Sequence, residues 1–240
     1  MPLKRRSKRY RKRLFEKKHP HQTRQKRKPV PDFLLEDAAR NEGYAIIAGV
    51  DEAGRGPWAG PVVAAAAVLE HGVVPLALLA QLDDSKKLKA ALRADIFSRL
   101  KEMPGVYLGV GEASIEEIDQ YNILEATMMA MTRAVAALSV SPDMALVDGN
   151  RTPDMPCAVR TVVKGDALSL SIAAASIAAK ETRDRIMRQL AEVHPGYGWE
   201  NNAGYGTTQH QAALAKLGVT EHHRRSFKPI KALMMKDDLG

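Results

Sequence analysis

Acidic residues stand at the ends of three apolar runs that have the character of β-strands. Asp51 and Glu52 follow the run AIIAGV and precede a turn. Asp148 follows MALV, and Asp166 follows TVVKG. Strands of one sheet can bring such ends together. Mg²⁺ prefers oxygen ligands, and two such ions about 3.5–4 Å apart can clamp the attacking and leaving oxygens of a phosphodiester. The four carboxylates therefore form a candidate site for metal-dependent hydrolysis.

Each of these acids also has a purely local interpretation. Asp51 and Glu52 could open a turn. Asp148 with Gly149 is a favourable turn dipeptide, and Asp166 could cap the N-terminus of a helix. For Asp148 and Asp166 taken singly, the local interpretation is the better one. Taken jointly, and with the loop that follows Glu52, the acids favour a site.

That loop reads GRGP and places Gly54 and Gly56 on either side of Arg55. Glycine lets the backbone approach a ligand closely, and arginine can pair with phosphate. The tetrapeptide alone is a weak signal, since turns often contain Gly and Pro. Its position directly after two candidate metal ligands strengthens it.

The elements that must position these residues follow from hydrophobic periodicity. Strands are expected at 45–51, 62–70, 106–112, 143–148 and 158–164, and helices at 32–42, 86–103, 115–138 and about 168–193. Asp84 or Ser85 could cap the second helix, and Ser114 with Glu117 forms a capping box before the third. The first two strands, joined by a short loop, indicate a hairpin. This order predicts an α/β domain with one central mixed sheet, followed from His194 onward by loops and short helices.

Length and composition restrict the class of protein. With 240 residues, 45% of them hydrophobic and 27% charged, the chain fits a soluble globular protein with a sizeable core. Its longest apolar run, 62–69, is too short to span a membrane. We expect no export, since no apolar signal-peptide segment follows the basic N-terminus. The single cysteine, Cys157, excludes an internal disulfide and a cysteine-rich zinc site, so a reducing, cytoplasmic location fits best.

Positive charge is concentrated at the N-terminus. Residues 1–31 hold 14 Lys and Arg against one acid, a net charge of +13, whereas the remainder has a net charge of −5. Such an arm suggests a polyanionic partner, because Lys and Arg displace counterions from phosphate. A disordered, solubilising tail is an equal alternative, and a mitochondrial transit peptide is disfavoured by the few serines. We assign 1–42 to a basic arm and linker, 43–230 to the catalytic domain and 231–240 to a tail.

A series of motifs across residues 45–230 resembles type 2 ribonuclease H, the ribonuclease HII family. The motifs follow one another in the family's order, and so many ordered matches are very specific. The basic arm falls outside them. The motifs are AGVDEAGRGPWAGPVVAAAAVL, LDDSKKL, EIDQYNILEATMMAM, LVDGN, VVKGDALSLSIAAASIAAKETRD, GYGT and EHHRRSF.

The resemblance implies a ribonuclease-H-like fold, with a five-stranded sheet flanked by helices and a helical C-terminal extension. It implies hydrolysis of the RNA strand of RNA–DNA hybrids. It also implies nicking of DNA duplexes 5′ to an embedded ribonucleotide, which leaves 3′-hydroxyl and 5′-phosphate ends. The family's metal-binding acids fall on four residues, expected to bind Mg²⁺ or Mn²⁺ for two-metal-ion catalysis: Asp51, Glu52, Asp148 and Asp166.

Substrate contacts are implied in the same way. The loop Gly54, Arg55 and Gly56 is expected to read the ribose 2′-hydroxyl, which distinguishes RNA from DNA. Tyr205 is expected to stack on the sugar beyond the scissile phosphate. The expected phosphate contacts are Lys86 and Lys87, for which a solvated helix start is an alternative; Lys164 and Lys180 are weaker candidates.

Three residues with reactive side chains receive no catalytic role. Metal-activated water needs no side-chain nucleophile, so Ser176 and Cys157 are expected to be packing residues. Asp184 lies 18 residues beyond Asp166, about 25 Å along one continuous helix, and cannot share its metal site. We expect Asp184 to be a surface or salt-bridging group.

Three features near the C-terminus depart from simple expectation. The family often has Lys where Ala203 stands, so that substrate contact is absent. Glu181 replaces the usual aliphatic residue, which puts local packing in doubt. His222 and His223 are expected to be structural or to face phosphate rather than bind zinc, because adjacent histidines on a helix point in different directions.

Two other functions compete with this interpretation. A non-catalytic RNA-binding protein would act through the basic arm, and another nuclease of the same superfamily would share clustered acids without the DEAGRGP and SIAAAS strings. The expected partners are RNA–DNA hybrid and ribonucleotide-containing duplex DNA, with no membrane. We expect a monomer and leave contact with a replication clamp open.

Overall fold

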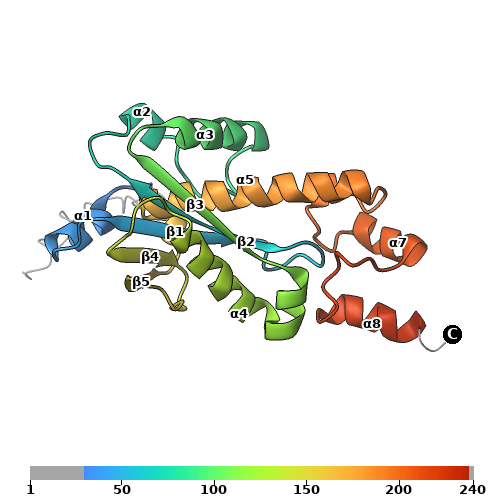
Figure 1. The fold of residues 1–240 in the computed structure, drawn as a ribbon. Helices are drawn as coiled ribbons and strands as arrows, with labels where there is room; N and C mark the ends of the chain where they lie inside the picture. Colours follow the sequence, from blue (N-terminus) through green and yellow to red (C-terminus); the bar gives the residue numbers. More distant parts are fainter. Residues whose placement is uncertain (1–29, 238–240) are drawn as a thin grey trace, which may run out of the picture.

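The apolar runs form five strands of a single sheet in the computed structural model, which describes residues 30–237 (Figure 1). The strands are β1 (Ile47–Ala53), β2 (Val62–Leu69), β3 (Val106–Ala113), β4 (Met144–Asp148) and β5 (Ala158–Val162). Their order is β3-β2-β1-β4-β5. The pairs β1–β2 and β2–β3 are antiparallel, whereas β1–β4 and β4–β5 are parallel. The predicted mixed five-stranded sheet and its first hairpin are confirmed.

Helices cover both faces of this sheet (Figure 1). Helix α4 (Ile115–Ala136) packs on one face; α3 (Ala90–Glu102), the short α2 (Leu76–Leu79) and α5 (Leu170–Val193) pack on the other. A 3₁₀ turn, η1 (Gly165–Ala167), precedes α5. All eight residues of β2 are buried, as its position between two layers requires. Ala65 and Ala67 contact the α3–α5 side, and Ala64 and Ala66 contact the α4 side.

Strand β1 and helix α5 approach each other unusually closely at Gly49. A Cβ placed on Gly49 would lie 2.1 Å from the carbonyl carbon of Ser171 in the first turn of α5. Only glycine allows this distance. The contact fixes the start of α5 beside the part of β1 that carries Asp51.

The helix starts predicted from the sequence are only partly confirmed by the structure. The predicted capping box is present: the Ser114 hydroxyl accepts from the Glu117 backbone N–H, and the Glu117 carboxylate accepts from the Ser114 N–H. The prediction that Asp84 or Ser85 caps α3 is wrong, because α3 begins at Ala90. Asp84 instead accepts from the Lys86 N–H within a turn, and the Ser85 hydroxyl bonds to Ser176, so neither is free to cap.

Residues just before β1 pack against the domain. The expected short helix is present as α1 (Leu34–Asn41). Glu36 is buried and accepts hydrogen bonds from the Ser169 hydroxyl, at 2.7 Å, and from the Ser171 N–H, at 3.0 Å. The segment assigned to the linker therefore holds the start of α5. Most of the basic arm, residues 1–29, lies outside the described residues.

The C-terminal extension lies beyond one end of the sheet (Figure 1). It contains α6 (Trp199–Asn202), α7 (Thr208–Leu217) and α8 (Lys228–Asp237), joined by loops as expected. Its own apolar cluster includes Ala59, Met187, Trp199 and Ile230. The extension is therefore anchored on the last turns of α5 and on the loop after β1. Among the described helices, none has the length and apolar character needed to cross a membrane.

We predict that Glu36→Ala lowers the free energy of unfolding by about 1–3 kcal/mol, because two buried donors lose their acceptor. Asp37→Ala is the matched control on the same helix. The Asp37 carboxylate is part-exposed and pairs with Arg40, so its loss should cost about 0–1 kcal/mol. Urea denaturation measures both values. Equal losses would contradict the role of Glu36.

Candidate active site

Two of the acids meet because β1 and β4 are parallel neighbours. Their register pairs Val50 with Val147, so Asp51 and Asp148 occupy the next position of each strand. Asp51 is 5% exposed. Strand β1 continues to Ala53, beyond the predicted end, so Asp51 and Glu52 lie within the strand opposite the small residues of β2. The sheet thus holds both backbones rigidly.

Asp166 joins this group through the turn before α5. The Gly165 N–H donates to the Asp148 carboxylate at 2.7 Å, which ties η1 to the end of β4. The alternative that Asp166 caps a helix is wrong. Ser169 is the N-cap of α5, and its hydroxyl accepts from the Ile172 N–H at 3.1 Å. The Asp166 carboxylate is therefore left for other contacts.

The acids lie close enough to perturb one another. Burial raises the pKa of Asp51 well above its usual value, and the charges of Glu52 and Asp148 raise it further. Burial also raises the pKa of Glu52, although Arg55 opposes the effect. Burial raises the pKa of Asp166, with further contributions from Asp84 and Asp148. Carboxylates held together in this way favour a shared proton or a cation.

The donor set fits hard divalent cations. All four side chains offer carboxylate oxygens, which Mg²⁺ and Mn²⁺ prefer. No three of these four acids have ligand atoms that all lie within 4.8 Å of one another. Among the described residues, such a compact group is formed elsewhere, by His194, Glu221 and His222. Wider spacing suits a pair of ions about 3.5–4 Å apart, which shares the ligands between two centres.

Asp51 has two polar neighbours, of which sequence reasoning missed Ser176 and had named Lys86 only as a phosphate contact. The Ser176 hydroxyl, on α5, hydrogen-bonds to Asp51 and to Ser85, so it orients the acid rather than merely filling space. Lys86 is an exposed residue; partial desolvation lowers its pKa, but the charges of Asp51 and of three other acids outweigh this and raise it. The positive charge of Lys86 therefore lies near the acidic group. The SIAAAS string gave no sign of this role for its second serine.

The Gly54–Gly56 loop is held in shape by two buried arginines. Arg224 donates to the carbonyl oxygens of Gly54, Arg55, Gly60 and Pro61. Arg183 donates to the carbonyl oxygens of Ala59, Pro61 and Ala203. A Cβ at Gly54, whose φ is +98°, would lie 2.0 Å from the Arg183 side chain, so this position requires glycine.

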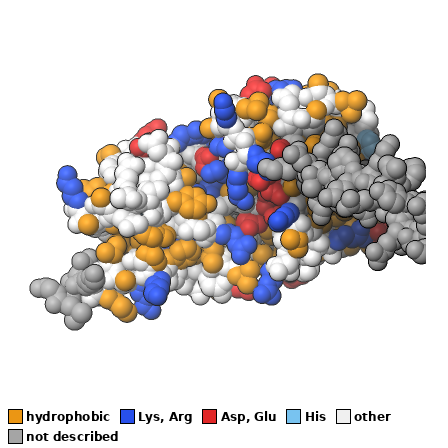
Figure 2. Space-filling model, turned by 180° about the vertical axis from the view of Figure 1, so that it is seen from behind, with side chains coloured by type: hydrophobic (Ala, Val, Ile, Leu, Met, Phe, Trp, Pro, Cys, Tyr) orange, Lys and Arg blue, Asp and Glu red, His pale blue; other side chains and the backbone are white. Residues whose placement is uncertain are grey.

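A groove of about 400 Å³ lies beside this loop. Figure 2 shows Asp and Glu side chains gathered near the middle of one face of the molecule, with Lys and Arg side chains beside them. The groove brings together most of the predicted substrate-contacting residues, namely Gly54, Arg55, Gly56, Lys86, Lys180 and Tyr205, and it also reaches Glu52. Lys87 and Lys164 are outside its lining. Lys87 pairs with Asp83 at 2.7 Å.

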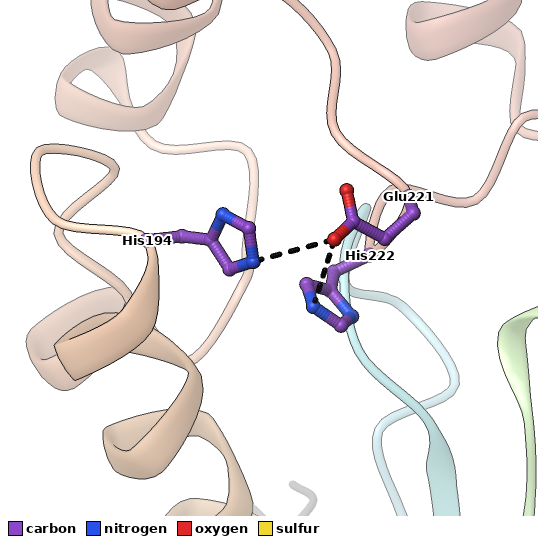
Figure 3. Close-up of side chains that lie close together, drawn as sticks. All are labelled: His194, Glu221 and His222. Atoms are coloured by element: carbon purple, nitrogen blue, oxygen red, sulfur yellow. Dashed lines mark ion pairs between the residues drawn. The ribbon is translucent and has the colours of Figure 1, made fainter.

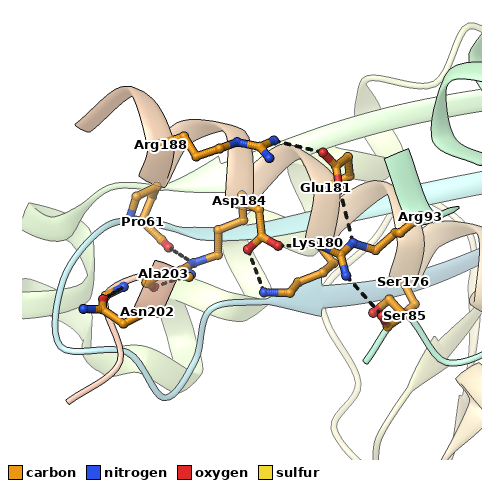
Figure 4. A network of polar contacts seen from close by, with 12 residues as sticks. Pro61, Ser85, Arg93, Ser176, Lys180, Glu181, Asp184, Arg188, Asn202 and Ala203 are labelled. Atoms are coloured by element: carbon orange, nitrogen blue, oxygen red, sulfur yellow. Dashed lines mark hydrogen bonds and ion pairs between the residues drawn. The ribbon is translucent and has the colours of Figure 1, made fainter. Parts of the chain in front are cut away.

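Arg93 and Lys180, which line the groove, belong to an ion-pair network on α3 and α5 (Figure 4). Arg93 pairs with Glu181 at 3.3 Å and with Asp184 at 2.7 Å, and Lys180 also pairs with Asp184. Arg188 forms a second ion pair with Glu181, at 3.0 Å. Asp184 is thus the salt-bridging residue that was expected. Glu181 is accommodated because its buried carboxylate has two arginine partners.

The C-terminal histidines occupy a turn, not a helix, so the directional argument made from the sequence does not apply. His223 is buried; its Nε2 lies 3.1 Å from Nε2 of His210, and its Nδ1 accepts from the Thr220 N–H. This confirms a structural role for His223.

Ala203, where the family often has Lys, adopts a left-handed conformation with φ 48°, and its carbonyl accepts a hydrogen bond from Arg183.

The electrostatics give a test that needs no substrate. Burial raises the pKa of Asp51, so the folded protein holds this proton more tightly than the unfolded chain, and ionisation of Asp51 opposes folding. The resulting loss in the free energy of unfolding grows as pH rises from the ordinary pKa of an aspartate through the raised pKa of Asp51. In metal-free buffer, we predict that Asp51→Asn is more stable than the native protein at about pH 8, with the gain disappearing near about pH 4.

Asp143→Asn is the control of opposite sign. Hydrogen bonds from the Ile46 and Ala45 backbones lower the pKa of Asp143, so its charge favours folding. This variant should lose stability at high pH and lose less as pH falls through the lowered pKa. Thermal melts across pH measure both effects. If Asp51→Asn is less stable than the native protein at high pH, then ionisation of Asp51 does not oppose folding.

Comparisons with known proteins agree with this geometry. The sequence model of the family described as ribonuclease HII matches residues 48–230. A ribonuclease HII from Rhodospirillum rubrum is 57% identical over 210 residues, which is 88% of this chain and 94% of that protein. The crystal structure of ribonuclease H2 from Pyrococcus horikoshii superposes with a TM-score of 0.67 at 26% identity, over 82% of this chain and all of that one.

A more distant structure, Bst-RNase HIII in complex with Mn²⁺, superposes with a TM-score of 0.66 at 20% identity, over 85% of this chain and 73% of that one, and supports the fold. The expected ribonuclease-H-like fold is therefore confirmed. The family match covers most of the chain, including all but the first residue of β1, as well as β4, η1, α6 and α7. The chain belongs to the ribonuclease HII family and is a ribonuclease H.

Proposed function

We propose that this enzyme hydrolyses the RNA strand of RNA–DNA hybrids and nicks DNA duplexes on the 5′ side of an embedded ribonucleotide. The products carry 3′-hydroxyl and 5′-phosphate ends. The observation that carries the proposal is the position of the Gly54–Gly56 loop, which begins two residues after Glu52 and lines the same groove as Glu52. A phosphodiester next to the four acids would therefore have its sugar at this loop.

The acids serve as ligands for Mg²⁺ or Mn²⁺: Asp51, Glu52, Asp148 and Asp166. Bound divalent ions supply a hydroxide nucleophile and stabilise charge on the leaving 3′-oxygen. The chain's own residues hold the acids in place. Ser176 and the Glu52 N–H donate to Asp51, and the Gly165 N–H donates to Asp148. Lys86 adds positive charge where the phosphate enters.

Recognition of the ribose rests on the rigidity of the loop. Arg224 fixes the carbonyl groups of Gly54 and Arg55, and Arg183 fixes those of Ala59 and Pro61 just after the loop, so the peptide groups of this segment cannot rotate freely. Arg55 is half-exposed and pairs with Glu52 at 3.2 Å. A Cβ on Gly56 would lie 3.4 Å from the Tyr205 ring, so loop and ring are neighbours. Tyr205 is 46% exposed, which leaves its ring available to stack on a sugar.

We further propose that the protein acts as a monomer in the cytoplasm, where it removes ribonucleotides from DNA. Contact with a replication clamp stays open, as does the choice between a polyanion-binding and a solubilising role for the basic arm, most of which lies outside the described residues.

The direct test uses a DNA duplex that contains one ribonucleotide. With Mg²⁺ or Mn²⁺ we expect a single nick 5′ to the ribonucleotide, no cleavage of the all-DNA duplex, and no cleavage in EDTA. End-labelled products on a sequencing gel locate the nick, and ligation identifies its ends. An intact ribonucleotide duplex, with cleavage of a continuous hybrid retained, would remove the single-ribonucleotide activity from the proposal.

Substitution of the acids separates chemistry from binding. Asp51→Asn and Asp148→Asn should abolish cleavage and still bind the duplex, because the amides keep the shape of the acids without their charge. Asp95→Asn, at an exposed acid of α3, should cleave normally. Gel-based cleavage and fluorescence anisotropy measure the two properties. Unchanged turnover in Asp51→Asn would exclude this residue from the site.

The loop can be tested through Arg224. We predict that Arg224→Lys lowers kcat/KM on the ribonucleotide duplex by about a hundredfold, since the misplacement of a binding group by about 1 Å costs this much. Lysine cannot reproduce the planar fork that reaches four carbonyls. Arg225→Lys, at the exposed neighbour, should cost far less. Equal effects of the two substitutions would show that the hydrogen bonds of Arg224 are unimportant for catalysis.

A further inference from the structure

Three metal-ligating side chains converge at the far end of α5, outside the acidic site (Figure 3). They are His194, at the C-terminal end of α5, and Glu221 and His222, in the turn before α8. One ligand atom from each lies within 4.8 Å of the others. Nε2 of His194 and Nε2 of His222 lie 3.5 and 3.7 Å from the same oxygen, Oε1 of Glu221. Both separations exceed the usual 2.7–3.2 Å of an N–H···O hydrogen bond, so such bonds do not explain the arrangement.

We propose that His194, Glu221 and His222 form a binding site for a divalent transition-metal ion, with zinc as the best fit. Imidazole nitrogen suits zinc, whereas Mg²⁺ favours sites made of oxygen alone. At metal–ligand distances of about 2.0–2.1 Å, tetrahedral ligand atoms lie about 3.3–3.4 Å apart. The ring-to-carboxylate distances of 3.5 and 3.7 Å are already near this value, and the ligand nitrogens of the two rings lie within 4.8 Å of each other, so an approach of the rings would bring all three ligand atoms around one ion.

The ligands are held from both sides by the rest of the chain. The His194 N–H donates to the Leu190 carbonyl at 2.8 Å, which keeps His194 on the last turn of α5. The His222 carbonyl accepts from the Gly60 N–H at 2.9 Å. The two rings contact each other edge to face at 4.7 Å, and both contact Trp199, which is fully buried. Such anchoring reduces the entropy that binding would otherwise cost.

The surroundings suit a cation that enters from solvent. The two histidine side chains are 22% and 25% exposed, whereas Glu221 is 67% exposed, so the rings are sheltered and the carboxylate side is open. Three protein ligands leave a fourth position for water.

The position of the site suggests its effect. His222 lies two residues before Arg224, which fixes the Gly54–Pro61 segment. An ion between His194 and His222 would join the end of α5 to the turn that carries Arg224. Zinc would thus cross-link the C-terminal extension to the catalytic domain. This inference stands independently of the proposed nuclease activity.

The test measures zinc retained by the full-length protein, produced without a histidine tag. His19 and His21, outside the described residues, are replaced by Gln so that they bind no zinc. After zinc loading and gel filtration, mass spectrometry should find one equivalent fewer in His222→Gln and in Glu221→Gln than in their parent. Glu221 is exposed, so its variant should fold even if the histidine variant does not. X-ray absorption of the loaded parent should show two imidazole ligands at about 2.0–2.1 Å.

Two controls isolate the site. His71→Gln removes another histidine that lies 3.2 Å from a carboxylate, that of Asp37, and should leave the zinc content unchanged. In an Asp51→Asn background, which weakens the carboxylate site, Glu221→Gln should cause the same loss of one equivalent. The proposal is overturned if the parent retains no zinc, if both site variants retain as much zinc as the parent, or if the absorption spectrum lacks imidazole scattering.

Discussion

The structure depends on one unfavourable arrangement, the buried Asp51 carboxylate beside Glu52 and Asp148. Taking a carboxylate out of water is costly, and neighbouring negative charges increase the cost. The fold supplies partial compensation through the Ser176 hydroxyl, the Glu52 N–H and the charge of Lys86. The uncompensated part of this cost favours a shared proton or a bound cation at the site. The parallel pairing of β1 with β4 and the close contact of Gly49 with α5 both serve to hold this group in place.

The second constraint is the shape of the segment after β1. Its carbonyl groups point at two buried guanidinium groups, from Arg183 on α5 and Arg224 in the C-terminal extension. Burial lowers the pKa of Arg183 to about 10 and that of Arg224 to about 9, which still leaves both charged at neutral pH. The extension therefore contributes to the groove although it carries none of the four acids. This explains how residues more than 160 positions apart shape one surface.

The sequence predicted the elements whose patterns are local. Apolar runs located all five strands, and the Ser114 capping box located the start of α4. The resemblance also named the acids, because the motifs that contain them follow one another in the family's order. Contacts made across the fold were not predictable in this way. Neither Ser176 nor Arg183 differs in sequence from an ordinary helix residue, and the turn at Ser85 resembles a helix start until its contact with Ser176 is known. The left-handed Asn122 in α4, with φ 69°, had no sequence signal either.

The central claim is that carboxylates from β1, β4 and η1 bind the catalytic metal ions. It is tested most directly by a crystal structure of the full chain with Mn²⁺ and a duplex containing one ribonucleotide, with Mn²⁺ located by anomalous scattering. We expect peaks between Asp51, Glu52, Asp148 and Asp166, next to the phosphate on the 5′ side of the ribonucleotide. Anomalous peaks found only at His194 and His222, or a ribonucleotide phosphate bound away from these acids, would contradict the account.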